Sequence, residues 1–203
     1  MMTISADSFD QVVRAFEKAP QIAEQAARLA VNEAARFGRV RASEQMRNEV
    51  NWQKGYVDQR LTVAPAKGTA LSATITGRWR PTSLSRFLVR APAKGRAMKV
   101  QVKAGGGVKE LKRAFPVRLR AGSGRTDSKY NQGIAIRLPK GKQPRNTTAA
   151  IELSSTGKST AWLLYGPSIN MVFRDVRYKV DDQIADRLSS EFIRQFARLS
   201  NNG

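Results

Sequence analysis

The spacing of apolar residues changes twice along this chain, and this change limits the folds that the chain can adopt. Towards both ends, apolar residues recur every three or four positions, as with Val180, Ile184 and Leu188, which is the period of an amphipathic helix. In the middle, residues 71–76 alternate apolar and polar side chains, which is the period of a half-buried strand. Helices, then several strands, then a helix predict an α+β fold.

Helices are predicted over most of the first 47 residues and near the end of the chain. One helix is predicted around residues 9–16, and Pro20 is expected to begin a second, because proline is tolerated at the first helical position. The second helix carries an alanine-rich apolar stripe, and Gly38 leaves open whether it continues, bends or stops. A short helical stretch is predicted at residues 56–61, and an amphipathic helix at residues 180–199 closes the chain.

The central part of the chain predicts a mainly antiparallel sheet with long basic loops. Residues 108–114 are expected to form a helical turn, and Gly166 with Pro167 a sharp turn after the last strand. The 203 residues suit one domain. We expect a helical part at 1–62, a β-rich basic core at 63–168 and a helical part at 169–203. Strands are expected at residues 71–76, 97–103, 133–138 and 162–165, another apolar stretch at 115–119, and loops at 90–96, 120–131 and 139–149.

Almost all of the positive charge lies in the middle of the chain. Residues 1–35 carry three Lys/Arg and five Asp/Glu, residues 36–150 carry 26 and five, and residues 151–203 carry seven and six, which gives the total of +20. So localised a field favours a polyanion such as a nucleic-acid backbone. The cations of a structural building block can equally face acidic protein neighbours, so both partners stay open.

Catalytic chemistry finds little support in the sequence. The chain has no cysteine and no histidine, so disulfides, thiol chemistry and the commonest general base and metal ligand are excluded. Residues 155–160 (Ser-Thr-Gly-Lys-Ser-Thr) resemble the end of a phosphate-binding loop, but Glu152 stands where that motif needs a glycine. The carboxylates are too scattered for a metal-dependent nuclease. We expect no enzyme activity, no cofactor and no bound metal.

Several basic residues are candidates for contact with DNA or with an acidic partner. Trp79 stands between two arginines and could stack on bases, but we expect it to pack in a core or an interface. No apolar run approaches the roughly 20 residues of a membrane-spanning helix, so no membrane partner is expected. The candidate contacts are Arg78, Arg80, Arg86, Arg125, Lys129, Lys140, Lys142 and Arg145.

Three landmarks occur in order along the chain. The first is the alanine-rich helix followed by Trp52 and residues 55–61 (Gly-Tyr-Val-Asp-Gln-Arg-Leu). The second is residues 80–87 (Arg-Pro-Thr-Ser-Leu-Ser-Arg-Phe), with Lys-Arg-Ala-Phe later at 112–115. The third is residues 164–169 (Leu-Tyr-Gly-Pro-Ser-Ile), which lead into the closing helix. Together they resemble the minor tail protein Z family of tailed bacteriophages, the tail completion proteins, and Arg137 corresponds to an arginine usual in that family.

This resemblance implies a structural virion protein and not an enzyme. Such a protein would be assembled in the host cytoplasm, would complete the head-proximal end of the tail, and would contribute to head–tail joining around the DNA channel. Its implied partners are tail terminator or tube proteins, head–tail connector or portal-proximal proteins, and copies of itself in a ring such as a hexamer. The genomic DNA would lie nearby. The alternative is a soluble, basic nucleic-acid-binding protein, which the charge alone would also explain.

Overall fold

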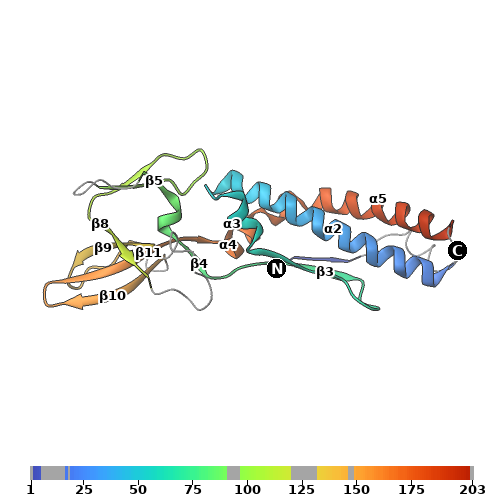
Figure 1. Ribbon diagram of the computed structural model, residues 1–203, viewed down its shortest axis with the longest axis horizontal. Coiled ribbons are helices and arrows are strands. Elements are labelled where there is room, and N and C mark those ends of the chain that lie inside the picture. Colours follow the sequence, from blue (N-terminus) through green and yellow to red (C-terminus); the bar gives the residue numbers. More distant parts are fainter. Residues whose placement is uncertain are drawn as a thin grey trace. The chain divides into compact units, whose positions relative to one another are not determined.

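The computed structural model describes residues 2–5, 17, 19–90, 97–119, 132–145 and 149–201, so the helix predicted around residues 9–16 lies outside the described part. The protein has the predicted α+β fold, with helices, antiparallel sheets and a C-terminal helix (Figure 1). It divides into two compact units. The first comprises Met1–Met46, Gln53–Arg78 and Ile169–Gly203, and the second comprises Arg47–Trp52 and Trp79–Ser168. We describe each unit separately.

The first unit is built on two long helices and a small sheet. Helix α2 (Pro20–Glu49) and helix α5 (Asp181–Ser200) run side by side in Figure 1, and an ion pair between Glu33 and Arg187 joins them. The sheet has the antiparallel order β1-β3-β2. Its strands are β1 (Met2–Ser5), β2 (Leu61–Ala64) and β3 (Ser72–Gly77). Shorter helices are α3 (Lys54–Asp58), α4 (Ile169–Val176) and the 3-10 helix η4 (Arg177–Lys179).

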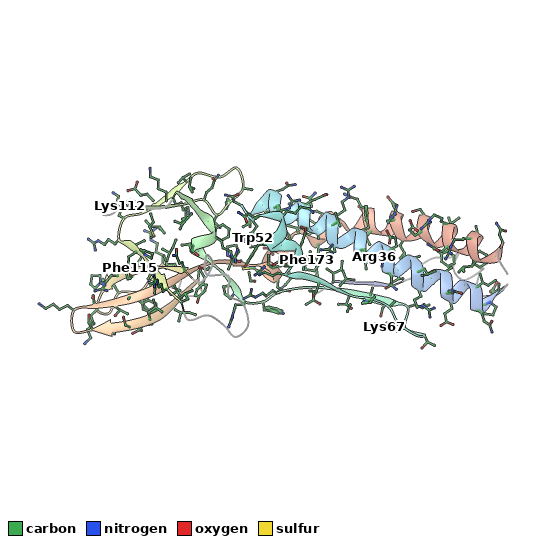
Figure 2. All side chains as sticks on the ribbon, viewed as in Figure 1. Arg36, Trp52, Lys67, Lys112, Phe115 and Phe173 are labelled. Carbon is green, nitrogen blue, oxygen red and sulfur yellow. The ribbon has the colours of Figure 1, made fainter. Side chains whose placement is uncertain are left out.

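The core of the first unit follows the helical periodicity predicted from the sequence. Helix α2 continues through Gly38 and buries a face made mainly of alanines, which lets neighbouring elements approach closely. Helix α5 buries Ile184, Leu188 and Phe192, as predicted. Phe173 of α4 is fully buried in the same unit (Figure 2). The unit therefore has an apolar core of its own.

The second unit consists of two antiparallel sheets. The larger has the order β10-β11-β9-β8, with β4 paired to the far end of β11, and the smaller has the order β5-β6-β7. The strands of the larger sheet are β4 (Pro81–Ser83), β8 (Ala114–Arg118), β9 (Gln132–Pro139), β10 (Ala150–Thr156) and β11 (Ser159–Ser168). The smaller sheet contains β5 (Leu88–Arg90), β6 (Met98–Val100) and β7 (Lys109–Leu111), and the 3-10 helix η1 (Leu84–Phe87) precedes it.

The core of the second unit gathers around Phe87, which is 1% exposed. The ring of Trp52 lies 6.3 Å from it, centroid to centroid, and Trp52 is labelled in Figure 2. Met98 and Val100 of β6 and Leu84 of η1 are also buried. The strands predicted at 71–76, 97–103, 133–138 and 162–165 are confirmed, although the second is limited to β6.

Two sequence-based predictions are wrong, and a third is wrong in one of its two alternatives. Residues 108–114 form no helical turn, because residues 109–111 pair with β6 as strand β7. Gly166 and Pro167 form no sharp turn but lie within β11, and Gly166 has no positive φ. The pairing of β11 with β4 is irregular between Gly166 and Ser168, where proline has no N–H to donate. Trp79 does not pack in a core, since 69% of it is exposed, and packing in an interface stays a prediction.

Candidate polyanion-binding site

The positive charge belongs mainly to the second unit. This unit carries 20 Lys/Arg and four Asp/Glu, whereas the first carries 16 and 12, which together make up the 36 and 16 of the whole chain. The net charges are therefore +16 and +4. Four carboxylates cannot neutralise 20 cations within the second unit, so most of its cations need solvent, counterions or an external anion.

Two arginines of helix α5 in the first unit form ion pairs with its carboxylates. Arg187 of α5 lies 3.6 Å from Glu33 of α2 and 2.9 Å from Glu191, measured between nitrogen and carboxylate oxygen. Arg194 lies 2.6 Å from the other oxygen of Glu191, which is 4% exposed. Two arginines thus neutralise one buried carboxylate, as burial of a charge requires. These cations have a structural explanation that needs no ligand.

Strand register gathers six cations at one end of the larger sheet of the second unit. Ser159 of β11 pairs with Pro139 of β9, and the Lys140 N–H donates to the Lys158 carbonyl at 3.2 Å. On the other side of β9, Ala114 pairs with Ile136, so the turn before β8 lies at the same end. In Figure 1, the end of β9 and the turn between β10 and β11 lie at the same end of the sheet, at the left of the picture. We call this surface the basic end: Lys112, Arg113, Arg137, Lys140, Lys142 and Lys158.

Tight turns display the lysines of the basic end. The Lys142 N–H donates to the Pro139 carbonyl at 3.0 Å, and Gly141 has a φ of 79°, so Lys140 and Lys142 flank the corner of a glycine turn. Lys158 lies in the turn between β10 and β11, where the Thr156 hydroxyl donates to the Ser159 carbonyl at 3.1 Å. All six cations of the basic end are exposed. The turns therefore expose the charged groups of these lysines to solvent.

Arg137 and Glu152 lie on the strands of the sheet, further from the tip than the lysines of the turns. The guanidinium of Arg137 lies 5.5 Å from the ring centroid of Phe115, which holds it over the sheet. Phe115 is labelled in Figure 2, as is Lys112 at the turn before β8. Glu152 of β10 pairs with Trp162, three residues along β11 from Ser159, which corresponds to about 10 Å. The tip itself carries no carboxylate at residues 139–142 or 156–159.

Only part of the predicted contact set lies at the basic end. Lys140 and Lys142 are there, and exposed Arg145 follows in the same loop. Arg80 precedes Pro81, which pairs with Ser168 at the opposite end of β11, about 30 Å along the strand from Ser159. Arg86 is half-buried beside that end, Arg78 is an exposed residue of the first unit, and Arg125 and Lys129 lie outside the described residues.

The contact set predicted from the sequence does not include Lys112, Arg113, Arg137 or Lys158, which lie at the basic end. The sequence indicates Lys158 only as part of a stretch that resembles a phosphate-binding loop, whereas the structure places that stretch in a β-hairpin turn. Gly157-Lys158 between two alternating stretches was a usable hairpin signal. Lys158 lies next to Lys140 because of the register between β9 and β11, which local sequence does not determine.

The described residues offer no arrangement that suggests a metal centre: no group of three or more Asp or Glu side chains is placed to hold an ion. Within the same part of the chain, no helix has the length and apolar character to span a bilayer. No protein-family model matches the sequence, and neither the curated proteins nor the solved structures yield a match.

Proposed function

We propose that this chain is a structural protein of a tailed-bacteriophage virion and not an enzyme. In this proposal it completes the head-proximal end of the tail and contributes to head–tail joining around the DNA channel. The support from the sequence is the ordered resemblance to the minor tail protein Z family, from the alanine-rich helix to the closing helix. Its α+β fold is compatible with that resemblance.

The observation that carries the proposal is the edge strand β10. Among the described residues, β10 pairs with β11 alone, so no described strand pairs with the backbone groups on its other side. Six of its seven residues are exposed, including Ile151 at 55% and Leu153 at 42%. An open edge with exposed apolar side chains is a template for pairing with another chain. The opposite edge strand, β8, contains Pro116, which weakens that edge as a template.

An assembly subunit can use such an edge to contact a neighbour, whereas a soluble monomer has reason to protect it. We therefore propose that β10 contributes to contacts with neighbouring subunits in a ring such as a hexamer, or with other tail and neck proteins. Tail terminator or tube proteins and head–tail connector or portal-proximal proteins are the proposed partners. The virion tail is the proposed location, close to the genomic DNA.

The proposal is tested by the mass of the assembled protein. In Ile151→Lys/Leu153→Lys, two cations on the exposed edge should block strand addition while the hydrogen bonds between β10 and β11 remain. We expect light scattering in about 0.15 M salt, where charges are screened beyond about 8 Å, to show a discrete oligomer for the wild type and a monomer for the variant.

A matched control adds the same charge elsewhere in the second unit. Val89 and Val108 are 52% and 49% exposed in or beside the smaller sheet, and Val89→Lys/Val108→Lys should assemble like the wild type. If wild type and both variants stay monomeric, alone and with tail extracts, the assembly proposal is wrong. Tight duplex binding by such a monomer would establish the alternative, a soluble nucleic-acid-binding protein.

A further inference from the structure

We infer that the basic end binds the phosphate backbone of double-stranded nucleic acid without reading its sequence. The inference depends on the charge and register of one sheet and not on the proposed place in a virion. It assigns to one surface three cations that sequence analysis had not placed among the contacts: Lys112, Arg113 and Lys158. It also adds Arg137 and leaves Arg80 and Arg86 outside the site.

Charge spacing is the first step of the argument. Neighbouring strands lie about 4.8 Å apart, so the four strands β10, β11, β9 and β8 distribute the six cations over about 14 Å. The distance between neighbouring strands is shorter than the Debye length of about 10 Å at 0.1 M salt, so cations on adjacent strands repel one another until an anion neutralises several of them together. The width is comparable with the DNA grooves, about 6 and 12 Å, so cations at the two sides of the basic end can reach phosphates across a groove.

The chemistry of the tip favours phosphate over an acidic protein surface. Protein interfaces centre on aromatic and other apolar anchors and are depleted in lysine. Residues 139–142 and 156–159 contain three of the lysines and no aromatic, Leu, Ile, Val or Met residue. Their hydroxyls, on Thr156 and Ser159, and their turn N–H groups are of the kinds that commonly contact phosphate oxygens.

The same composition favours a duplex over a single strand. Proteins that bind single strands combine cations with aromatic rings on which bases stack. At the basic end, Phe115 is half-buried with the Arg137 guanidinium 5.5 Å from its ring centroid, and Trp79 lies next to Arg80, outside the larger sheet and on the far side from the tip. Four of the six cations are lysines, flexible point charges suited to phosphates and not to bidentate base recognition. Binding should therefore be independent of sequence.

The test measures duplex affinity against salt concentration. We compare wild type with Lys140→Gln/Lys142→Gln/Lys158→Gln, using fluorescence anisotropy of two unrelated 20-base-pair DNA duplexes. Each lost phosphate contact should lower the slope of log affinity against log salt by about 0.9, so the triple variant should lose up to about 3 in slope. At about 0.1 M salt its affinity should fall at least about tenfold for both duplexes.

The matched control is Lys99→Gln/Lys103→Gln/Lys109→Gln. It removes three exposed lysines from the smaller sheet and the loop beside it, in the same unit, and should change affinity less than about threefold. All six lysines are exposed, so circular-dichroism melting curves of both variants should match the wild type. Equal losses in both variants would show a diffuse charge effect and overturn the inference.

Two competitors of the labelled duplex distinguish it from the other possible partners, which are a single strand and an acidic protein. A single strand of equal length that binds more tightly than the duplex would overturn the choice of duplex. Polyglutamate that displaces the duplex at a lower concentration of charge than unlabelled duplex would assign the basic end to an acidic protein instead. Neither result depends on the oligomer mass, so the inference and the assembly proposal can fail separately.

Discussion

At the scale of single residues, Gly166 shows how a glycine can be required by packing and not by its backbone angles. It lies in β11 without a positive φ, and a Cβ built on it would be 2.5 Å from Cε2 of Phe87. Phe87 is 1% exposed in the core of the second unit, so its ring has little room to move. We expect Gly166→Ala to lower the free energy of unfolding by about 1–3 kcal/mol, the range for overpacking a core.

Urea denaturation measures this loss, and two further variants identify its cause. Gly157→Ala adds the same methyl group in the turn between β10 and β11, where nothing lies within 4 Å, and should stay within about 0.5 kcal/mol of wild type. In a Phe87→Leu background, Gly166→Ala should cost less than in the wild type, because the two sites are in contact. An unchanged cost in that background would rule out the ring of Phe87 as its cause.

At the scale of elements, the short helix α3 is held on α2 by one carboxylate. Asp58 accepts a hydrogen bond from the Ser43 hydroxyl at 2.8 Å, and its oxygens lie 3.3 Å from Lys54 and 3.9 Å from Arg39. Partial burial by itself would raise the pKa of Asp58. The hydrogen bonds from Ser43 and Lys54 and the charges of Lys54 and Arg39 outweigh burial, so the pKa lies below its ordinary value of 3.8.

A lowered pKa means that the ionised form stabilises the folded state. This stabilisation is fully present above the ordinary value of 3.8 and is lost as the pH falls below it, through the lower pKa of the folded protein. We expect Asp58→Asn to reduce the free energy of unfolding by about 1–2 kcal/mol at pH 7, with the difference from wild type narrowing towards pH 2. Asp186→Asn, the same substitution at an exposed position of α5, should change the free energy of unfolding at pH 7 by less than about 0.5 kcal/mol. A constant difference between wild type and Asp58→Asn across that range would contradict this account.

At the scale of the whole molecule, the two units differ in the electrostatic repulsion among their own charged residues. The second unit has a net charge of +16 and the first +4. Self-repulsion destabilises a compact state, and salt screens it. We expect amide hydrogen exchange to slow in the second unit, for example at residues 132–139, when NaCl rises from about 0.05 to 0.5 M. Residues 181–200 of the first unit should respond less. An equal response of both segments would contradict a local origin.

The elements with strong local periodicity could be predicted from the sequence. Helices α2 and α5 and strands β3 and β9 follow from their apolar spacing, because burial of one face selects that spacing. Strand β7 could not be predicted, because residues 109–111 become a strand only by pairing with β6. The structure divides the chain into two compact units. That residues 1–203 form one domain stays a prediction.

The sequence by itself determined the class of the fold and the excess of positive charge, since both depend on composition and local order. Tertiary structure decided which cations meet. Lys112, Arg137 and Lys158 are separated by more than 20 residues from one another in the chain, and antiparallel register brings their strand ends together. It also decided that Gly166 serves close packing and not a turn, because Phe87 approaches it from a distant part of the chain. Register and packing depend on contacts between distant residues, which local sequence patterns do not encode.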